Sequence, residues 1–310
     1  MLVITHTPEA GTLIDGTAKG DGTAPILKRC GWRWGRSIST WYLAHSRDRR
    51  PKLHIITRTQ AELTRAGYDV SLDIDDTVRA AVEVEAATAA RAADRVKALE
   101  VKADRRRADE ARAWKKADDT LGRLPEGGEP IKVGHHSEKR HRRDVQSAHT
   151  SLGRAVEAQQ DVEAVEARLR AAQSATARRY SPGAVARRID KLEAQLRGTE
   201  RILNGYTRSK GTPYAEWQPP AAGAARTHHE SVRAEVVDKI AYWTAVRDEQ
   251  IATGQATNYS KDTVSKGDRV RVWGHWRTVV RANPKTVSLA TGYSWTDKVA
   301  YHEIEDVKHQ

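Results

Sequence analysis

The sequence predicts a multidomain protein of the α+β class: a small N-terminal α/β module, a long antiparallel helical hairpin with extra helices, and a small C-terminal β-barrel. Three observations predict this arrangement. Short apolar runs separated by Gly and Pro fill residues 1–74. An alanine-rich, highly charged segment without Gly or Pro follows, which is typical of a long helix. Residues 259–310 alternate apolar and polar side chains between turn residues, as short strands do.

The composition argues against a single large core and points to a polyanionic partner. Only 38% of the residues are hydrophobic, Phe is absent, and much of the apolar share is Ala, which buries little surface. The chain carries 53 Lys and Arg against 41 Asp and Glu, a net charge of +12. Such an excess favours nucleic acid as the partner, because binding then releases condensed counterions.

Other features of the sequence narrow the class of protein. Cys30 is the only cysteine, so an intrachain disulfide and a cysteine-rich zinc site are excluded. No run of about 18 apolar residues occurs. The N-terminus also lacks a basic segment followed by an apolar one. We therefore expect a cytoplasmic protein without a membrane partner.

Residues 1–74 predict a small module rich in Trp and Arg. We expect a helix over residues 23–30, ended by Gly31, and a strand pair formed by residues 32–34 and 38–43. The other expected elements are strands at 2–4, 12–14, 53–56 and 70–74 and a helix at 59–66.

Residues 75–204 predict an antiparallel coiled-coil hairpin and a third helix. Asp75 or Asp76 caps a helix that runs to about Thr120, and a second helix is expected over residues 137–178. Each carries an apolar stripe at the spacing of a coiled-coil seam, and the same stripes would allow a homodimer. The stripes comprise Ala89, Ala92, Val96, Leu99, Ala103, Ala113 and Ala117 in the first helix and Val145, Ala148, Leu152, Ala155, Val162 and Leu169 in the second.

The remainder of the chain predicts helices, a linker and a barrel. Pro182 is well placed in the first turn of a third helix, which Gly205 ends. Residues 205–230, with three prolines, predict a linker, and residues 231–256 a further helix. Residues 259–310 alternate regularly enough to predict an SH3-like barrel.

The segment from Gly134 to Asp144 is the densest group of potential ligands in the sequence. It combines three imidazoles, four Lys or Arg and two carboxylates beside a predicted helix start. Ser137 is the expected N-cap, which would leave backbone N–H groups free near His135 and His136. A helix N-terminus attracts phosphate. Three arginines could add direct ion pairs, namely Arg140, Arg142 and Arg143. The segment therefore predicts phosphate contact.

Two other interpretations of this segment stay open. Glu138 and His141 lie at i and i+3 on one helix face, so with His135 or His136 they could hold Zn²⁺ or Mn²⁺. Alternatively, Glu138 pairs with Arg142 one turn later, and the segment only stabilises the helix. The phosphate interpretation requires no cofactor.

Two further regions combine positive charge with aromatic rings, as base stacking and phosphate neutralisation require, and the third helix adds an excess of positive charge. An alternative is that the Trp residues supply the core of a chain without Phe. The candidates are Arg33, Trp34, Arg36 and Trp41 in the first module, Arg187 and Arg188 in the third helix, and Arg271 and Trp276 in the barrel.

The segment GHHSEKRHRRD, which follows residues 130–133, and the later run AVARRIDKLEAQLRGTERIL resemble an uncharacterised coiled-coil family, domain of unknown function 3560. The N-terminal GWRWGRSISTWYLAHSRDR segment and the C-terminal module resemble the flanking parts of its actinobacterial members. The family occurs on bacterial plasmids, integrated elements and phages. The resemblance implies an accessory role for a mobile element or its host, and it assigns no catalytic residue.

We therefore expect a non-enzymatic protein that binds the backbone phosphates of nucleic acid with little base specificity. One alternative is a metal-dependent phosphodiesterase or nuclease that uses His135, His136, Glu138 and His141. The other is a coiled-coil scaffold or protein-interaction module.

Overall fold

A computed structural model describes residues 1–124, 128 and 130–310. The chain separates into two compact units, each built from two segments. The first unit comprises Met1–Glu85 and Lys191–Tyr242, and the second comprises Ala86–Asp190 and Trp243–Gln310. None of the helices in the described part is both long and apolar enough to cross a membrane.

The N-terminal module is a five-stranded mixed sheet with two helices. The strands lie in the order β3-β4-β2-β1-β5, in which β1 and β5 are parallel and the other pairs antiparallel. The elements are β1 (Leu2–Thr7), β2 (Gly11–Asp15), α1 (Thr23–Arg29), β3 (Trp32–Gly35), β4 (Thr40–Leu43), α2 (Leu53–Arg65) and β5 (Val70–Ile74). The strand pair predicted around Gly35 is therefore present, and β3 lies at the edge of the sheet.

The strand predicted over residues 53–56 was wrong, because these residues form the first turn of α2. A four-residue apolar run fits a buried helix as well as a strand. Here Ile56, Thr59 and Leu63 are fully buried at three- and four-residue spacing, so one face of the helix covers the sheet.

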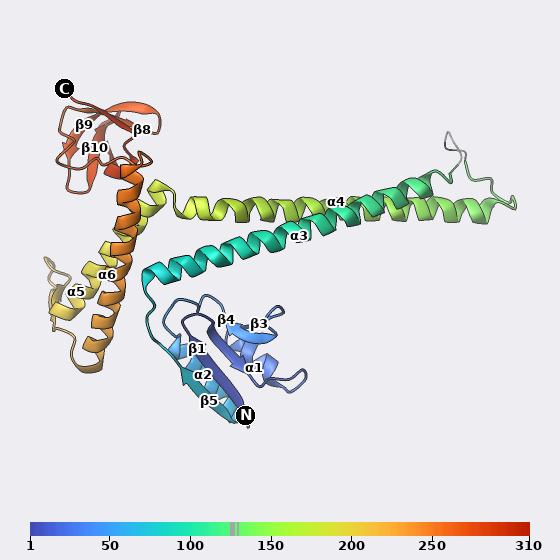
Figure 1. Cartoon of the computed structure of the whole chain (residues 1–310), viewed down its shortest axis with the longest axis horizontal. Helices are drawn as coiled ribbons and strands as arrows, with labels where there is room; N and C mark the ends of the chain where they lie inside the picture. Colours follow the sequence, from blue (N-terminus) through green and yellow to red (C-terminus); the bar gives the residue numbers. More distant parts are fainter. Residues whose placement is uncertain (125–127, 129) are drawn as a thin grey trace. The chain divides into compact units, whose positions relative to one another are not determined.

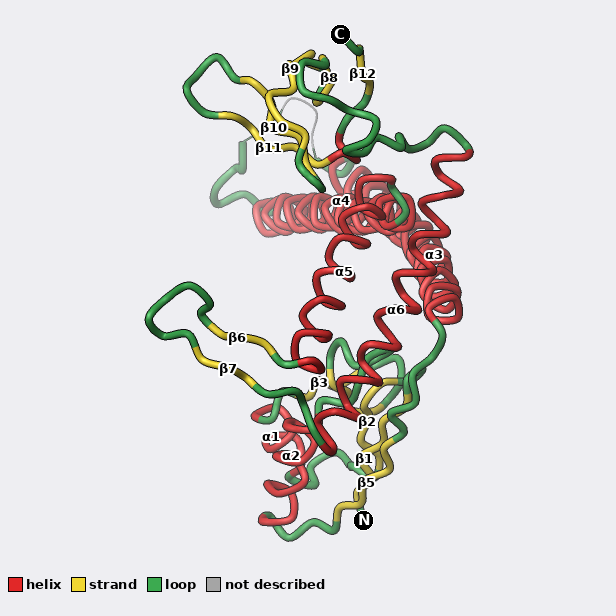
Figure 2. Tube along the Cα trace, turned by 90° about the vertical axis from the view of Figure 1, so that its left-hand side faces the viewer, coloured by secondary structure: helices red, strands yellow, loops and turns green. Residues whose placement is uncertain are grey.

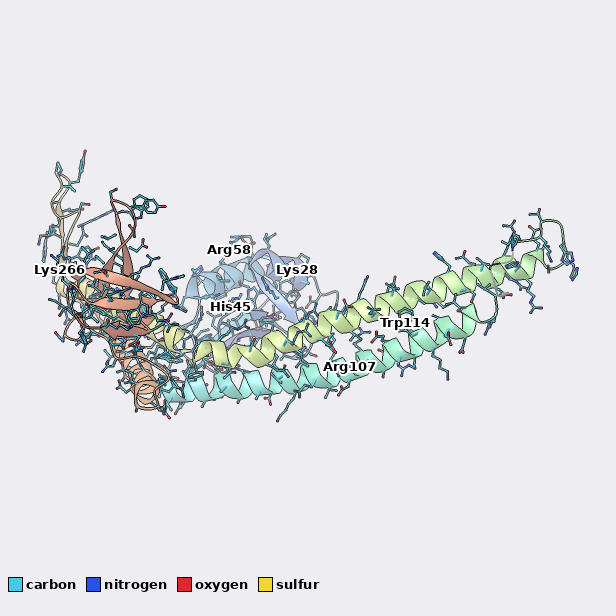
Figure 3. The ribbon with its side chains drawn as sticks, turned by 90° about the horizontal axis from the view of Figure 1, so that it is seen from above. Lys28, His45, Arg58, Arg107, Trp114 and Lys266 are labelled. Carbon is cyan, nitrogen blue, oxygen red and sulfur yellow. The ribbon has the colours of Figure 1, made fainter. Side chains whose placement is uncertain are left out.

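Two long helices, α3 (Ala81–Leu121) and α4 (Glu138–Arg179), form the predicted antiparallel hairpin. Figure 3 shows them side by side, with Arg107 and Trp114 on α3. Cross-helix contacts fix the direction and register. The hydroxyls of Thr120 and Ser151 meet near one end of the pair, and Arg107 donates to Glu166, 2.7 Å away, farther along.

Small side chains fill the interface between α3 and α4. Ala117, Ala148 and Ala155 are buried, as predicted, and Ser151 is buried beside them. Val145 and Leu152, predicted in the seam, stay more than a third exposed. The close approach of the alanine faces rotates the larger side chains to the border of the interface.

Two further helices follow, α5 (Pro182–Asn204) and α6 (Gly223–Ala252). The predicted linker is shorter than expected, because α6 begins at Gly223 and two short strands, β6 (Tyr206–Arg208) and β7 (Glu216–Gln218), pair between the helices. Figure 2 shows β6 and β7 side by side in this hairpin. Within the first unit, Asp238 of α6 accepts from the backbone N–H of Ala81, the first residue of α3, at 2.7 Å.

The C-terminal module is a five-stranded antiparallel sheet in the order β11-β10-β9-β8-β12. Its core is aliphatic, with Val270, Val287 and Leu289 fully buried. Among the described residues, the two edge strands of this sheet, β11 and β12, are not paired with each other. The closed barrel that the sequence predicted is therefore not observed. The strands are β8 (Arg269–Val272), β9 (His275–Ala282), β10 (Thr286–Ala290), β11 (Thr296–Ala300) and β12 (Asp306–Lys308).

Candidate functional site

The histidine-rich segment lies at the start of α4, at the end of the hairpin where the chain crosses from α3 (Figure 1). Ser137 occupies the N-cap position, as predicted, but its side chain makes no capping hydrogen bond. Its hydroxyl instead contacts Nδ1 of His135 at 2.8 Å. The Glu138 carboxylate accepts from the Gly134 backbone N–H at 2.7 Å and from Arg142 Nε at 2.9 Å.

These contacts hold Glu138 in its charged form. The Gly134 N–H and, next, the Arg142 guanidinium lower the pKa of its carboxyl below the ordinary value. The pairing of Glu138 with Arg142 that the sequence suggested is therefore present. Because Arg142 and the Gly134 N–H are both occupied, two of the expected phosphate donors are already used.

The imidazoles of this segment are accessible but do not form a metal centre. His135 and His136 are exposed, with ring centroids 4.0 Å apart, and His141 is half-buried. Among residues 1–124, 128 and 130–310, no three His, Cys, Asp or Glu side chains are arranged to hold one metal ion. The Zn²⁺ or Mn²⁺ alternative therefore gains no support from this geometry.

The other two arginines of the segment differ in their surroundings. Arg140 is exposed and lies 3.7 Å from Asp144, which makes a weak ion pair. Arg143 lines a groove between α4 and α3. Of the three arginines, Arg143 is therefore the one that shares a groove with a residue of α3.

The charged residues that line this groove, called the cationic groove below, are all basic. Lys116 of α3 lies opposite Arg143 and Arg154 of α4. No carboxylate lines it, and none of these three cations has an ion pair within the part of the chain that is described. The other lining residues are uncharged hydrogen-bonding side chains, namely Gln146, Ser147, Thr150 and Ser151.

The cationic groove ends at Arg154. The next hollow along the hairpin also contains Arg154 but has mixed charge, with Asp109, Glu157 and Asp161 in its wall. There Arg106 is 3.4 Å from Asp161. The lining of these two hollows therefore changes from basic to mixed charge at Arg154.

In the N-terminal module the two tryptophans predicted to stack on bases differ in their exposure. Trp34 is 46% exposed on the edge strand β3, whereas Trp41 is 6% exposed and belongs to the core. The two rings meet edge to face, with centroids 5.7 Å apart. Arg33 and Arg36 are exposed near Trp34 in the sequence. Of the two tryptophans, Trp34 is the one that offers a ring to a ligand.

The candidates in the third helix and the C-terminal module are largely occupied by intramolecular contacts. Arg188 lies over the buried ring of Trp243 at 4.0 Å, while Arg187 is exposed. Arg271 pairs with Glu305 at 3.1 Å. Trp276 is half-buried beneath Lys308, at 4.5 Å.

Sequence reasoning missed the partners of Arg143 in the cationic groove. Arg154 follows Arg143 by eleven residues on one helix, a spacing that returns to nearly the same face and could have been noticed. Lys116 could not have been found, because its position depends on the register between two helices.

One comparison with known proteins identifies part of the chain. Residues 87–207 match the model of a family described as Domain of unknown function (DUF3560). The chain contains a DUF3560 domain. No curated protein and no solved structure matches the chain.

The DUF3560 domain begins within α3 and ends just after α5. It therefore includes the histidine-rich segment and the whole cationic groove. The N-terminal module and the C-terminal sheet lie outside the match, which is narrower than the resemblance inferred from the sequence.

Proposed function

We propose that the protein is a non-enzymatic nucleic-acid-binding accessory protein, in which the cationic groove holds backbone phosphates with little base specificity. The observation that carries this proposal is the groove itself: Lys116, Arg143 and Arg154 converge there without a carboxylate. Free cations beside hydroxyl and amide donors provide what phosphate oxygens require.

The dimensions of the groove favour a polymer over a single anion. Arg143 and Arg154 are eleven residues apart on α4, which corresponds to roughly 16 Å along the helix. Phosphates of one strand of duplex DNA follow each other at about 3.4 Å of axial rise. The stretch of helix between the two residues is therefore longer than a single phosphate group, which suits a polymer of phosphates.

The rest of the chain supports a polyanionic ligand. The net charge is +12, and exposed Arg33 and Arg36 flank Trp34 on the edge strand of the N-terminal module. We further propose that the C-terminal sheet is of the SH3-like class and provides a second contact. The accessory role in a mobile element or its bacterial host is the one that the family resemblance implies.

Salt titration of DNA and RNA binding tests this proposal. The affinity should fall steeply as salt increases, because each neutralised phosphate releases counterions. Replacing Lys116, Arg143 and Arg154 with Ala should reduce the slope for duplex DNA by about 2 to 3. A matched control replaces three ion-paired arginines of the same hairpin, Arg106, Arg112 and Arg170. Equal effects of the two triple variants would contradict a specific role for the groove.

A second candidate function is a coiled-coil scaffold, favoured by exposed apolar side chains on the hairpin. Val145, Leu152 and Val156 follow one stripe of α4, about 200° around the helix from the positions that line the cationic groove. Trp114 and Leu121 of α3 are similarly exposed. Dimerisation through this stripe predicts a doubled mass in light scattering of the full chain, and Leu152→Glu should restore the monomer. A monomer at all concentrations would contradict it.

A further inference from the structure

The C-terminal module carries a group of exposed aromatic rings that the cationic groove does not explain. Tyr293 and Trp295 lie in the loop between β10 and β11 and are 72% and 58% exposed. Trp273, in the turn between β8 and β9, is 57% exposed. Large aromatic side chains contribute most when they are covered, so such exposure indicates a contact surface.

Tyr293 and Trp295 form a preorganised stack. Their rings are parallel within 6°, with centroids 4.5 Å apart. The Thr291 hydroxyl holds the loop, because it accepts from the Tyr293 backbone N–H and donates to the Trp295 carbonyl. A ligand that stacks on this pair therefore meets a flat face that is already ordered.

Arg277 adds a positive group beside the stack. It lines an open hollow together with Tyr293 and Trp295. Asp297 holds its guanidinium at 2.6 Å, and the same guanidinium lies 5.9 Å from the ring of Trp273. One carboxylate occupies no more than two of the five N–H donors of Arg, so donors remain for a ligand.

The turn that presents Trp273 is also unusual for its residue. Trp273 and Gly274 form a two-residue turn in which both φ angles are positive, at 52° and 77°. Asn, Asp or Gly normally occupies the first position of such a turn. A bulky residue held in the left-handed region without burial suggests that its ring serves binding.

We propose that Tyr293 and Trp295 stack an unpaired base of a single-stranded nucleic acid, with Arg277 and Trp273 beside the stacked base. The two rings lie in parallel contact and leave no gap into which a proline ring could insert. The pair therefore suits a flat ligand rather than a proline-rich peptide. The charge of the module also favours this class, since residues 259–310 carry nine Lys or Arg against six Asp or Glu. The inference deepens the proposed nucleic-acid binding and rests on it for the class of ligand.

The test measures binding of the full-length chain to fluorescein-labelled oligo(dT) of about 20 nucleotides and to a duplex of the same length, by fluorescence anisotropy. Replacing both Tyr293 and Trp295 with Ala should weaken oligo(dT) binding about tenfold or more, because one stacked base contributes that much. Binding to the duplex should stay nearly unchanged. The control is Tyr214→Ala, which removes an 83% exposed ring elsewhere in the chain.

Two further measurements separate stacking from a loss of folding. The Phe replacements at Tyr293 and Trp295 keep a ring at each position and should retain oligo(dT) binding. An abasic strand of the same length should bind the wild type at least as weakly as oligo(dT) binds the double Ala variant. Equal binding of the abasic strand and oligo(dT) to the wild type would overturn the proposal.

Failure of this inference is distinguishable from failure of the proposed function. If the duplex does not bind and the groove variant changes nothing, the phosphate groove is wrong, whereas aromatic-dependent oligo(dT) binding would still support base stacking. If the duplex binds through the groove but the double Ala variant binds oligo(dT) normally, base stacking is wrong. Binding of a proline-rich peptide or a neutral oligosaccharide to these rings, without oligo(dT) binding, would also overturn it.

Discussion

The hydroxyls of Thr120 and Ser151 meet inside the interface between α3 and α4, where most neighbouring contacts are made by alanine. One of the two hydroxyls donates to the other, which in turn donates to a carbonyl of its own helix. Both groups are therefore satisfied although they are buried, and the pair aligns the two helices at one position. The same alignment places Lys116 opposite Arg143 and so forms the cationic groove.

Ser151→Leu should destabilise the hairpin by about 1–3 kcal/mol, because a larger side chain does not fit where the helices approach closely. Ser147→Leu, one turn earlier on the same helix, replaces an exposed serine and should change stability by less than about 0.5 kcal/mol. The melting temperatures of the two variants, measured by circular dichroism, test this prediction. Equal melting temperatures would mean that the helices separate easily at Ser151.

Acid should loosen the start of α4. The pKa of Glu138 is lowered in the folded chain, so its contribution is complete above the ordinary value of 4.5 and is lost as the pH falls through the lowered value. The amide resonance of Gly134, which donates to this carboxylate, should therefore shift below pH 4.5. In Glu138→Gln the resonance should stay constant over that range. A midpoint above 4.5 would contradict the described contacts.

Trp243→Ala should cost the second unit about 3–5 kcal/mol, which is the usual loss for a large buried aromatic side chain. Trp243 is buried against Tyr180, with centroids 5.3 Å apart, and beneath Arg188. Trp217→Ala, at an exposed position on β7, provides the control. Chemical denaturation should show a large shift for Trp243 and a small one for Trp217.

Trp34→Ala and Trp41→Ala should have opposite consequences. Trp34 is largely exposed, so its loss should leave the melting temperature nearly unchanged and weaken nucleic-acid binding about fivefold or more. Trp41 is buried, so its loss should cost about 3–5 kcal/mol of stability. Anisotropy and melting of both variants test this. Unchanged binding in Trp34→Ala would remove the N-terminal module from the proposed interface.

The behaviour of individual residues shows which features the sequence could predict. The start of α4 near Ser137 was predictable from the local sequence, and the antiparallel pairing from the short connection between two long helices. The assignment of residues 53–56 failed, since a short apolar run has no period of its own. Trp34 and Trp41 have similar neighbours in the sequence and are paired with each other across β3 and β4. Trp34 is the more exposed of the two, and it lies on the edge strand β3, whereas Trp41 lies on the inner strand β4.

The two proposed contact sites were less predictable for the same reason. Lys116 joins Arg143 through the register between two consecutive helices, which a local pattern does not set. Arg277 reaches Tyr293 and Trp295 across neighbouring strands, whose pairing includes an irregularity near Ser288. Local patterns identify residue types that suit a ligand, but tertiary pairing selects the ones that meet.

Trp273→Asn should stabilise the C-terminal sheet and weaken its binding to a single strand. Asn adopts the positive φ of the first turn position more readily than Trp, so the stability gain should be about 0.5–1 kcal/mol. Amide hydrogen exchange at Val272 and His275, which flank the turn, should slow accordingly. Oligo(dT) affinity should fall, because the ring beside Arg277 is lost. If exchange becomes faster instead, Trp273 supports the fold, and its strained turn gives no evidence for a ligand.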